Sequence, residues 1–212
     1  MVFSSSLNFI NDSYIFSKKK IRSLYLSSNI YNKKITPSVI SALEYYPSPN
    51  LLDAIIKYDK KKINIENYSL NKIWDNKELT EKDYKNLNSF FWLFSLDLKS
   101  SKRATQEVIQ EWMNKNHRYN SKSWEMDIVA KRIIAWTSNS RLTYEDSGTD
   151  YKDKFNDILK KQINHLINEI EGSEEVDDKM IGCAAIILTG LSYQDKDGYL
   201  KIGLNLLRKL VK

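Results

Sequence analysis

The sequence predicts an all-α protein built of antiparallel helical hairpins, and three observations support this. The 212 residues include only 6 glycines and 3 prolines. All three prolines precede residue 50, so the rest of the chain is free to be helical. From Thr80 onward, apolar residues recur three and four positions apart, the period of a helix with one buried side. The composition is 42% hydrophobic and 12% aromatic, which is enough apolar material to offset the entropy cost of folding.

Residues 1–79 are expected to form a helix followed by an irregular strap. The helix is predicted over residues 5–30. Residues 36–50 contain all three prolines and predict an extended or turn-rich connector, because proline disfavours the helical conformation of the residue before it. In residues 61–75 apolar and polar residues alternate, and Ile and Tyr are frequent, which indicates a short hairpin or an irregular strap. The apolar side of the first helix carries Leu7, Ile10, Tyr14, Ile21, Leu24 and Tyr25.

Residues 80–212 are expected to form one domain of at least five successive helices. Short loops join them, which makes neighbouring helices antiparallel. Thr80 is a typical N-cap, and acidic residues follow it in the first turn. Gly172 is placed to end the fourth helix as a C-cap. The helices are expected over residues 80–98, 100–116, 123–138, 150–172, 177–193 and 195–212.

The last two helices carry the longest apolar segments. Residues 177–193 are apolar on nearly every side, which predicts a helix inside the protein. The longest apolar run, 183–191, is far shorter than the ~20 residues of a membrane helix, so no membrane partner is expected. The last helix reaches Lys212 without a cap or a polar tail, so we expect the chain to be the front part of something longer.

Residue usage argues against several kinds of site. Cys183 is the single cysteine, so it cannot form an internal disulfide or a zinc site, and its apolar neighbours predict a buried, inert thiol. No HExxH, CxxC, P-loop, GxGxxG or GxSxG motif occurs. No cofactor and no metal are therefore expected. The N-terminus lacks the basic segment of a secretory leader, which predicts a cytoplasmic chain as given, or a periplasmic one if the true start lies upstream.

The net charge of +6 and the pI of about 9.1 allow an anionic partner. The densest basic clusters, at residues 18–20 and 57–62, are typical of a solvated face. Basic residues do not interleave with aromatic ones along any stripe, so a nucleic-acid partner is not expected. Of the two histidines, His165 is placed on the polar edge of its helix, while His117 lies in a polar loop where ligand contact is more frequent.

The segment 123–136 leaves two interpretations open. In the structural one, Val129 and Trp136 pack in the core while Arg132 braces neighbouring helices, paired with an acid such as Glu125 or Asp127. In the functional one, aromatic side chains of a cleft stack on sugar rings and Arg132 meets a carboxylate. The candidate substrate-binding residues are His117, Tyr119, Trp124, Arg132 and Trp136; no catalytic residue is assigned.

The same segment carries a family resemblance. "EWMNKNHRYNSKSWEMDIVAKRIIAW" resembles the N-terminal helical part of bacterial heparinase II/III-like proteins, which have a Trp, a loop, a second Trp and a D-x-V-A-x-R-x-x-x-W helix. The upstream segments "LNSFFWLFSLD" and "SLNKIWDNKELTEKDYKNL" are similar to the preceding helix and strap of that family. The matching positions are Trp112, Trp124, Asp127, Val129, Ala130, Arg132 and Trp136.

The resemblance implies an incomplete (α/α) toroid. Full-length members of the family continue into a β-sandwich and resemble lyases that cut acidic polysaccharides at uronic acids by β-elimination. That reaction needs a neutralised carboxylate, a base and an acid, which the family supplies from later parts of the toroid and from the β-sandwich. This chain stops at Lys212 before those parts, so we expect it to be inactive alone, or active only with a complementary chain.

Three functions remain open from the sequence. The first is the N-terminal toroid segment of a heparinase II/III-like lyase, with an acidic polysaccharide as partner. The second is a non-catalytic helical scaffold that binds a protein partner, or a second copy of itself, through the last helices. An apolar patch that persists on those helices would favour this second function. The third, nucleic-acid binding, rests on the pI alone and predicts binding that falls steeply with salt.

Overall fold

The computed structural model describes residues 2–44, 74, 79–96 and 102–211, with side chains from residue 14 onward. Every regular element in these ranges is a helix, which confirms the all-α prediction for this part of the chain. The α-helices are α1 Val2–Leu26, α2 Asn29–Ile35, α5 Glu81–Ser89, α6 Lys102–Lys115, α7 Met126–Ser138, α8 Ser140–Thr143, α9 Thr149–Glu169, α10 Val176–Ser192 and α11 Tyr199–Leu210, and the 3-10 helices are η2 Phe91–Ser95 and η3 Ile170–Gly172.

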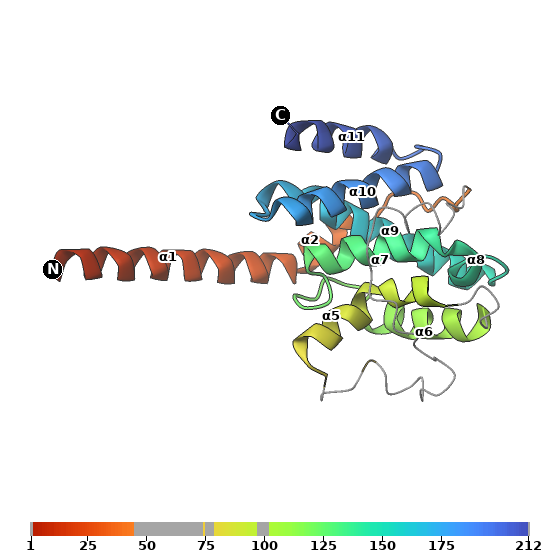
Figure 1. Cartoon of the computed structure of the whole chain (residues 1–212), viewed down its shortest axis with the longest axis horizontal. Coiled ribbons are helices and arrows are strands. Elements are labelled where there is room, and N and C mark those ends of the chain that lie inside the picture. Colours follow the sequence, from red (N-terminus) through yellow and green to blue (C-terminus); the bar gives the residue numbers. More distant parts are fainter. Residues whose placement is uncertain (1, 45–73, 75–78, 97–101, 212) are drawn as a thin grey trace.

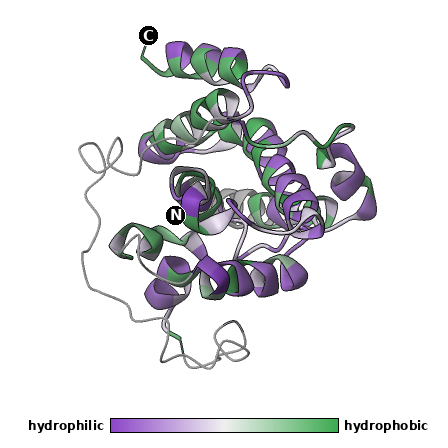
Figure 2. Cartoon of the chain, turned by 90° about the vertical axis from the view of Figure 1, so that its right-hand side faces the viewer, coloured by the Kyte–Doolittle hydropathy of each residue, from purple (hydrophilic) through white to green (hydrophobic). Residues whose placement is uncertain are grey.

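Helix α7 lies at the centre of the molecule. It packs against α10 on one side, against α5 and η2 on the other, and against α9. Helix α11 lies outside α10 and forms the outermost layer of that side (Figures 1 and 2). Figure 2 shows hydrophobic residues recurring along the helices with hydrophilic residues between them, as expected for amphipathic helices packed around one core.

The predicted first helix is two helices. Helix α1 ends at Leu26, and α2 starts after Ser28, whose hydroxyl accepts a hydrogen bond from the Tyr31 backbone N–H at 3.1 Å. This N-cap satisfies a donor that the first turn of α2 would otherwise leave unpaired. Most of α1 projects away from the other helices (Figure 1), whereas α2 packs against α9.

The described part of the predicted connector, residues 36–44, forms no helix and bends at residues 36, 38 and 39. The backbone N–H of Glu44 donates to the Ser192 carbonyl at 2.9 Å, which ties the connector to the end of α10. The strap expected over residues 61–75 lies outside the described residues except for Trp74, which is in a turn.

The helix predicted over 80–98 is shorter than expected. Thr80 caps it as predicted, because its hydroxyl accepts from the Asp83 backbone N–H at 3.2 Å. The helix ends at Ser89, and Phe90 adopts a left-handed conformation with φ of 57° before the chain continues as η2. Phe90 is fully buried, so burial of its ring stabilises a backbone conformation that non-glycine residues rarely adopt.

Helices α6 and α9 confirm the spacing argument. The residues at helical spacing on α6 are buried: Val108, Ile109, Trp112 and Met113. Those on α9 and η3 are buried except for the partly buried Ile167: Phe155, Ile158, Leu159, Gln162, Ile163, Leu166 and Ile170. The predicted end of α9 is wrong in detail. The α-helix ends at Glu169, and Gly172 lies in the 3-10 turn η3 rather than in a left-handed C-cap. Cys183 is buried, as predicted, and burial raises the pKa of its thiol.

Helices α10 and α11 pack closely against each other. A Cβ atom on Gly190 would lie 2.7 Å from the Leu200 Cα, and one on Gly203 would lie 2.7 Å from the Ile187 Cγ1. These two pairings make the helices antiparallel, as expected for a hairpin. The apolar sequence of α10 predicted a helix inside the protein. That prediction is wrong in part, because several large apolar side chains of α10 remain exposed.

Candidate functional site

The five predicted substrate-binding residues divide by exposure. His117 is exposed and Tyr119 is partly buried. Trp124, Arg132 and Trp136 have no more than 1% of their surface exposed. Trp124 precedes α7 rather than belonging to it. In the folded chain, His117 and Tyr119 are therefore the members of this set that solvent reaches.

The ring of Trp136 belongs to an aromatic core. It lies edge-on to Phe90 and Trp112, with ring centroids 5.3 and 5.5 Å apart, and it stacks on Phe155 at 5.1 Å. These rings come from the α5–η2 turn, α6, α7 and α9. Edge-to-face and stacked pairs at these distances add to the stability that burial provides. This core fixes the axis of α7.

Arg132 crosses this core as a fully buried cation. Its Nε donates to Gln162 Oε1 at 2.7 Å and its Nη1 donates to the Asn88 carbonyl at 2.7 Å. Its guanidinium carbon lies 4.1 Å from the centre of the Trp112 ring, a favourable cation–π position. Desolvation lowers the pKa of the guanidinium well below its ordinary value. Arg132 thus links α7 to the end of α5 and to α9.

The acids expected beside Arg132 lie elsewhere. Glu125 pairs with Lys85 at 2.8 Å, and Asp127 pairs with Lys131 at 3.1 Å. That part of the structural interpretation is wrong, because both carboxylates are partly exposed while Arg132 faces the interior. The bracing role itself agrees with the contacts of Arg132.

The centre around Arg132 holds more donors than acceptors. Within the described part of the chain, Arg132 Nη2, Trp136 Nε1 and Gln162 Nε2 are buried without a hydrogen-bond partner. Buried donors of this kind are infrequent in folded proteins. None of these three groups is a nucleophile or a base. As hydrogen-bond donors, they suit holding a neighbouring group in place rather than breaking a bond.

A second buried cluster surrounds His165, on α9. Its Nε2 lies 3.2 Å from the Trp124 carbonyl, which can only accept, so Nε2 carries the proton. Its Nδ1 therefore accepts from the Tyr31 hydroxyl at 2.8 Å. The ring of Tyr119 lies 5.4 Å from the His165 ring. The cluster thus joins α2, the 119–124 loop and α9 around a neutral imidazole.

Burial strongly disfavours the charged form of His165. Desolvation lowers the pKa of the imidazole from 6.5 to about 4, against a smaller opposing effect of the hydrogen bond to the Trp124 carbonyl. Burial also raises the pKa of the Tyr31 and Tyr119 hydroxyls. All three groups are therefore neutral at pH 7. The sequence placed His165 on the polar edge of α9, and the packing of α2 against α9 buries it.

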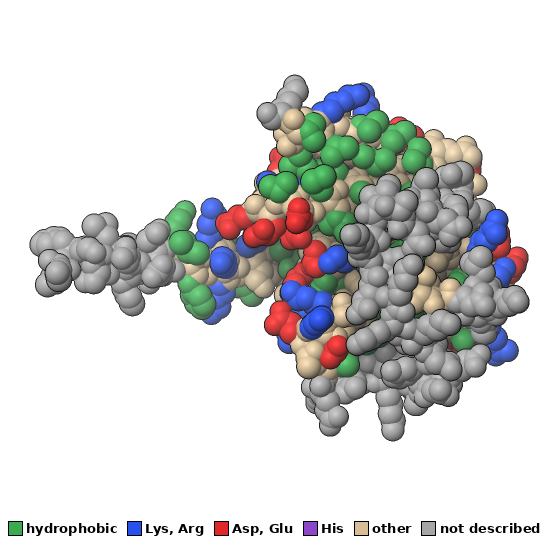
Figure 3. All heavy atoms as spheres, in the orientation of Figure 1, with side chains coloured by type: hydrophobic (Ala, Val, Ile, Leu, Met, Phe, Trp, Pro, Cys, Tyr) green, Lys and Arg blue, Asp and Glu red, His purple; other side chains and the backbone are tan. Residues whose placement is uncertain are grey.

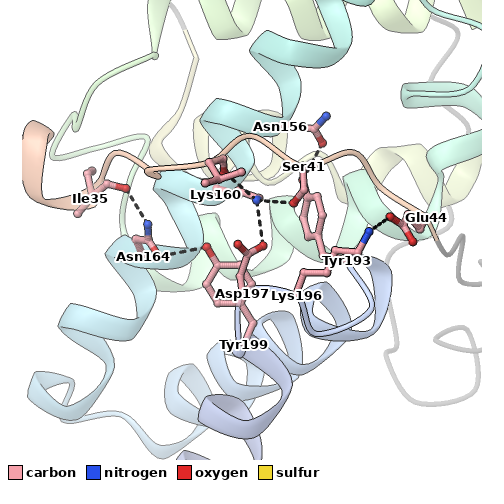
Figure 4. A network of polar contacts seen from close by, with 11 residues as sticks. Ile35, Ser41, Glu44, Asn156, Lys160, Asn164, Tyr193, Lys196, Asp197 and Tyr199 are labelled. Atoms are coloured by element: carbon pink, nitrogen blue, oxygen red, sulfur yellow. Dashed lines mark hydrogen bonds and ion pairs between the residues drawn. The ribbon is translucent and has the colours of Figure 1, made fainter.

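A third polar centre is built on Lys160, also on α9 (Figure 4). Its side chain is fully buried, and its ammonium group contacts Val39 O at 3.1 Å, Ser41 Oγ at 2.6 Å and Asp197 Oδ2 at 2.9 Å. The same group lies 4.9 Å from the centre of the Tyr193 ring. All three ammonium protons thus have acceptors. Lys160 connects α9 to the connector and to the loop between α10 and α11.

Neighbouring contacts extend the Lys160 centre. The Tyr193 hydroxyl donates to Asn156 Oδ1 at 2.7 Å, and Asn164 Nδ2 donates to the Ile35 carbonyl at 2.8 Å. Lys196 pairs with Glu44 (Figure 4). The sequence missed this centre, because its partners lie on other elements, and Val39 and Ser41 are 121 and 119 residues from Lys160 along the chain.

Among the described residues outside α1 and α2, exposed large apolar side chains occur in the connector, at Val39 and Ile40, and in a larger group on the terminal hairpin. Figure 3 shows hydrophobic side chains gathered over α10 and α11. The large apolar residues exposed there are Val176, Met180, Leu191, Leu204 and Val211. We call this set the hairpin face.

Other kinds of site have no support in the described residues. No group of three His, Cys, Asp or Glu side chains in them is arranged to hold a metal ion. None of their helices combines the length and apolar character needed to span a bilayer. Comparison with known proteins finds no matching family model, no matching curated protein and no matching solved structure.

Proposed function

We propose that this chain is a helical scaffold that binds a protein partner through the hairpin face. The single observation that carries the proposal is that this face remains exposed while the core beneath it is filled. Val176 is 58% exposed, Met180 49% and Val211 73%. Contiguous exposed apolar surface is typical of interaction sites.

The spacing of the exposed residues suits a partner that lies along the hairpin. Val176, Met180 and Leu191 follow at intervals of four and eleven, which keeps them on one side of α10. Leu204 lies on α11, and Val211, seven residues later, is the C-cap of that helix. Because the helices are antiparallel, Met180 and Val211 lie toward the same end of the hairpin. Two such stripes form the kind of surface on which a partner helix packs.

Charges at the end of the hairpin favour orientation of the partner. The first turn of α10 carries Asp177 and Asp178, while the last turn of α11 carries Arg208 and Lys209. Lys209 already pairs with Glu171 at 2.7 Å. A partner with charges of both signs near this end would be held in one alignment along the hairpin by these charges.

Site-specific photo-crosslinking tests this proposal. A photoreactive phenylalanine is placed at Leu204 or Met180, and at the exposed Lys201 as a matched control on the same hairpin. We expect the first two positions to crosslink one and the same protein in cells that express the chain, and Lys201 not to. Equal crosslinking at all three positions, or none at Leu204 and Met180, contradicts the proposal.

The second candidate is the toroid segment of a heparinase II/III-like polysaccharide lyase. The pattern from Trp112 to Trp136 supports it, as does the antiparallel α10–α11 hairpin, since such toroids are built of hairpins. In this case the hairpin face would meet further hairpins, and the exposed His117 and the partly buried Tyr119 would contact an acidic polysaccharide.

Binding to uronic-acid polysaccharides tests this second candidate. The chain is titrated with alginate, heparan sulfate and a neutral glucan as control. We expect binding to an acidic polymer that weakens at least tenfold in Tyr119→Ala, because sugar rings stack on aromatic side chains. Binding that Tyr119→Ala leaves unchanged would argue for simple charge attraction instead. Release of unsaturated uronate, seen by ultraviolet absorbance, would show that the chain is active alone.

A further inference from the structure

Helix α1 exposes apolar side chains at a distance from the rest of the protein. Tyr14 is 65% exposed, Ile21 68% and Leu24 66%. Its attachment lies at its C-terminal end, where Leu26 is buried and Arg22 pairs with Glu169. Figure 1 shows the helix extending from that point away from α2–α11.

A projecting helix of this kind needs a partner to be stable. In proteins, helices gain most of their stability from packing of an apolar side against another element. The 25 residues of α1 include basic residues at 18–20, yet no acidic residue four positions away supports them in the sequence. Among the described residues, the contacts of α1 lie at its C-terminal end, at Arg22, Tyr25 and Leu26.

The spacing of the apolar residues identifies what packs there. Leu7, Tyr14 and Ile21 follow at intervals of seven. The second core position of the same heptad holds Ile10, Ser17 and Leu24, so it is apolar except at Ser17. A repeat of 3.5 residues is the pattern of a coiled coil rather than of a helix on a broad surface. We propose that α1 forms a parallel two-stranded coiled coil with α1 of a second copy of this chain.

The charges of α1 favour the parallel arrangement. In this heptad Lys18 and Lys20 flank the apolar seam, and each would face the flanking position of the other strand. In the parallel pair Lys20 faces Tyr25 of the partner subunit and Lys18 faces Ser13 of the partner subunit. No like charges then oppose each other. Lys20 also gains a cation–π contact with an aromatic ring.

The attachment of α1 leaves the seam free. At 100° per residue, Leu26 lies roughly opposite the midpoint between Ile21 and Leu24 on the helix. The side of α1 that carries Leu26 and Arg22 is therefore turned away from the seam. Tyr25, which flanks the seam, also contacts Tyr31 of its own chain, with ring centroids 5.3 Å apart. Two copies can meet along α1 while each keeps its contacts at Leu26 and Arg22. This surface is separate from the hairpin face, so the inference does not depend on the proposed function.

Sedimentation equilibrium of the full chain tests the proposal, with Ile21→Glu as the variant. Phe16→Glu is the matched control, because Phe16 is 69% exposed on α1 but lies outside the seam. We expect a dimer for the native chain and for Phe16→Glu. For Ile21→Glu we expect a dissociation constant roughly 100-fold higher, because two charges would face each other across an apolar seam.

Disulfide trapping tests the orientation. In the parallel pair, a cysteine at position 21 faces its own counterpart, so Ile21→Cys should form a covalent dimer on mild oxidation. Phe16→Cys should not, and native Cys183 is buried. A native chain that is monomeric at high concentration, with no trapping at position 21, overturns the proposal. Binding to anionic lipid vesicles that Phe16→Glu and Ile21→Glu weaken equally would instead identify α1 as a membrane-surface helix.

Discussion

Arg132 is a cation in the core whose neighbours are an amide, a carbonyl and an indole ring. Removing either partner of its bond to Gln162 leaves the other buried and unpaired, which costs about 1–3 kcal/mol. We therefore expect Gln162→Leu to destabilise the native chain by about 2 kcal/mol. In an Arg132→Met background the same change should be stabilising, because Gln162 then has no cation to accept from.

Urea unfolding of the four proteins of this double-mutant cycle measures the sign change. An effect of Gln162→Leu that is the same in both backgrounds would mean that the 2.7 Å contact between the two side chains does not contribute to stability.

His165 makes stability depend on pH. Its pKa is about 4 in the folded protein and 6.5 ordinarily, so between these values the unfolded state binds a proton that the folded state does not. Its contribution is fully present above pH 6.5 and is lost as the pH falls toward 4. The shift corresponds to about 3 kcal/mol. We expect thermal unfolding of His165→Gln to show a shallower loss of stability than the native chain over pH 6.5 to 4. Parallel curves would contradict this role.

Residue-scale prediction from the sequence succeeded where the cause is local. The Thr80 cap depends on residues three positions apart, and it was found. The neutral state of His165 depends on Tyr31 of α2, which the sequence places 134 residues away. The position of Phe90 likewise follows from the aromatic rings that surround it. The spacing of apolar residues along a helix does not report such contacts between distant residues.

At the scale of elements, the crossing of α10 and α11 depends on two glycines. In a helix interior, alanine in place of glycine ordinarily stabilises by about 1 kcal/mol. We expect the opposite for Gly203→Ala, a loss of about 2 kcal/mol, because its Cβ would lie 3.0 Å from the Ile187 backbone nitrogen. Gly148→Ala is the control, since no atom lies within 4 Å of that Cβ, and it should change stability by about 0.5 kcal/mol at most.

Hydrogen exchange locates the effect of Gly203→Ala. Faster exchange confined to α11 and the end of α10 is the expected result. A stabilised Gly203→Ala variant would mean that the two helices do not pack as closely as described.

The sequence predicted the helices better than their ends. The spacing of apolar residues found α6 and α9, because one buried stripe decides each of them. It missed the division of the first helix at Ser27–Ser28, since a serine cap and a helix interior differ little in composition. It also joined α5 to η2, because the apolar residues continue at helical spacing across Phe90.

At the scale of the whole molecule, Lys160 holds distant segments together. We expect Lys160→Met to lower stability by about 2 kcal/mol, because it leaves Ser41 and the Val39 carbonyl without their donor. Asp197 is partly exposed and can be hydrated instead. Hydrogen exchange of residues 37–44 should accelerate while that of α7 does not. Arg103→Met is the control, since Arg103 is exposed and pairs with Glu107 on the same helix, and it should change stability little. Equal effects of the two variants would exclude a specific role for Lys160.

The positions of the tryptophans have an optical consequence. All five lie between residues 74 and 136, and Trp112 and Trp136 form the aromatic pair beside Arg132. Neither α1 nor the α10–α11 hairpin contains one. Tryptophan emission therefore follows melting of the layer built around α6 and α7, while circular dichroism follows every helix. If circular dichroism is lost at a lower temperature than the tryptophan emission changes, then α1 or the α10–α11 hairpin unfolds before the layer around α6 and α7.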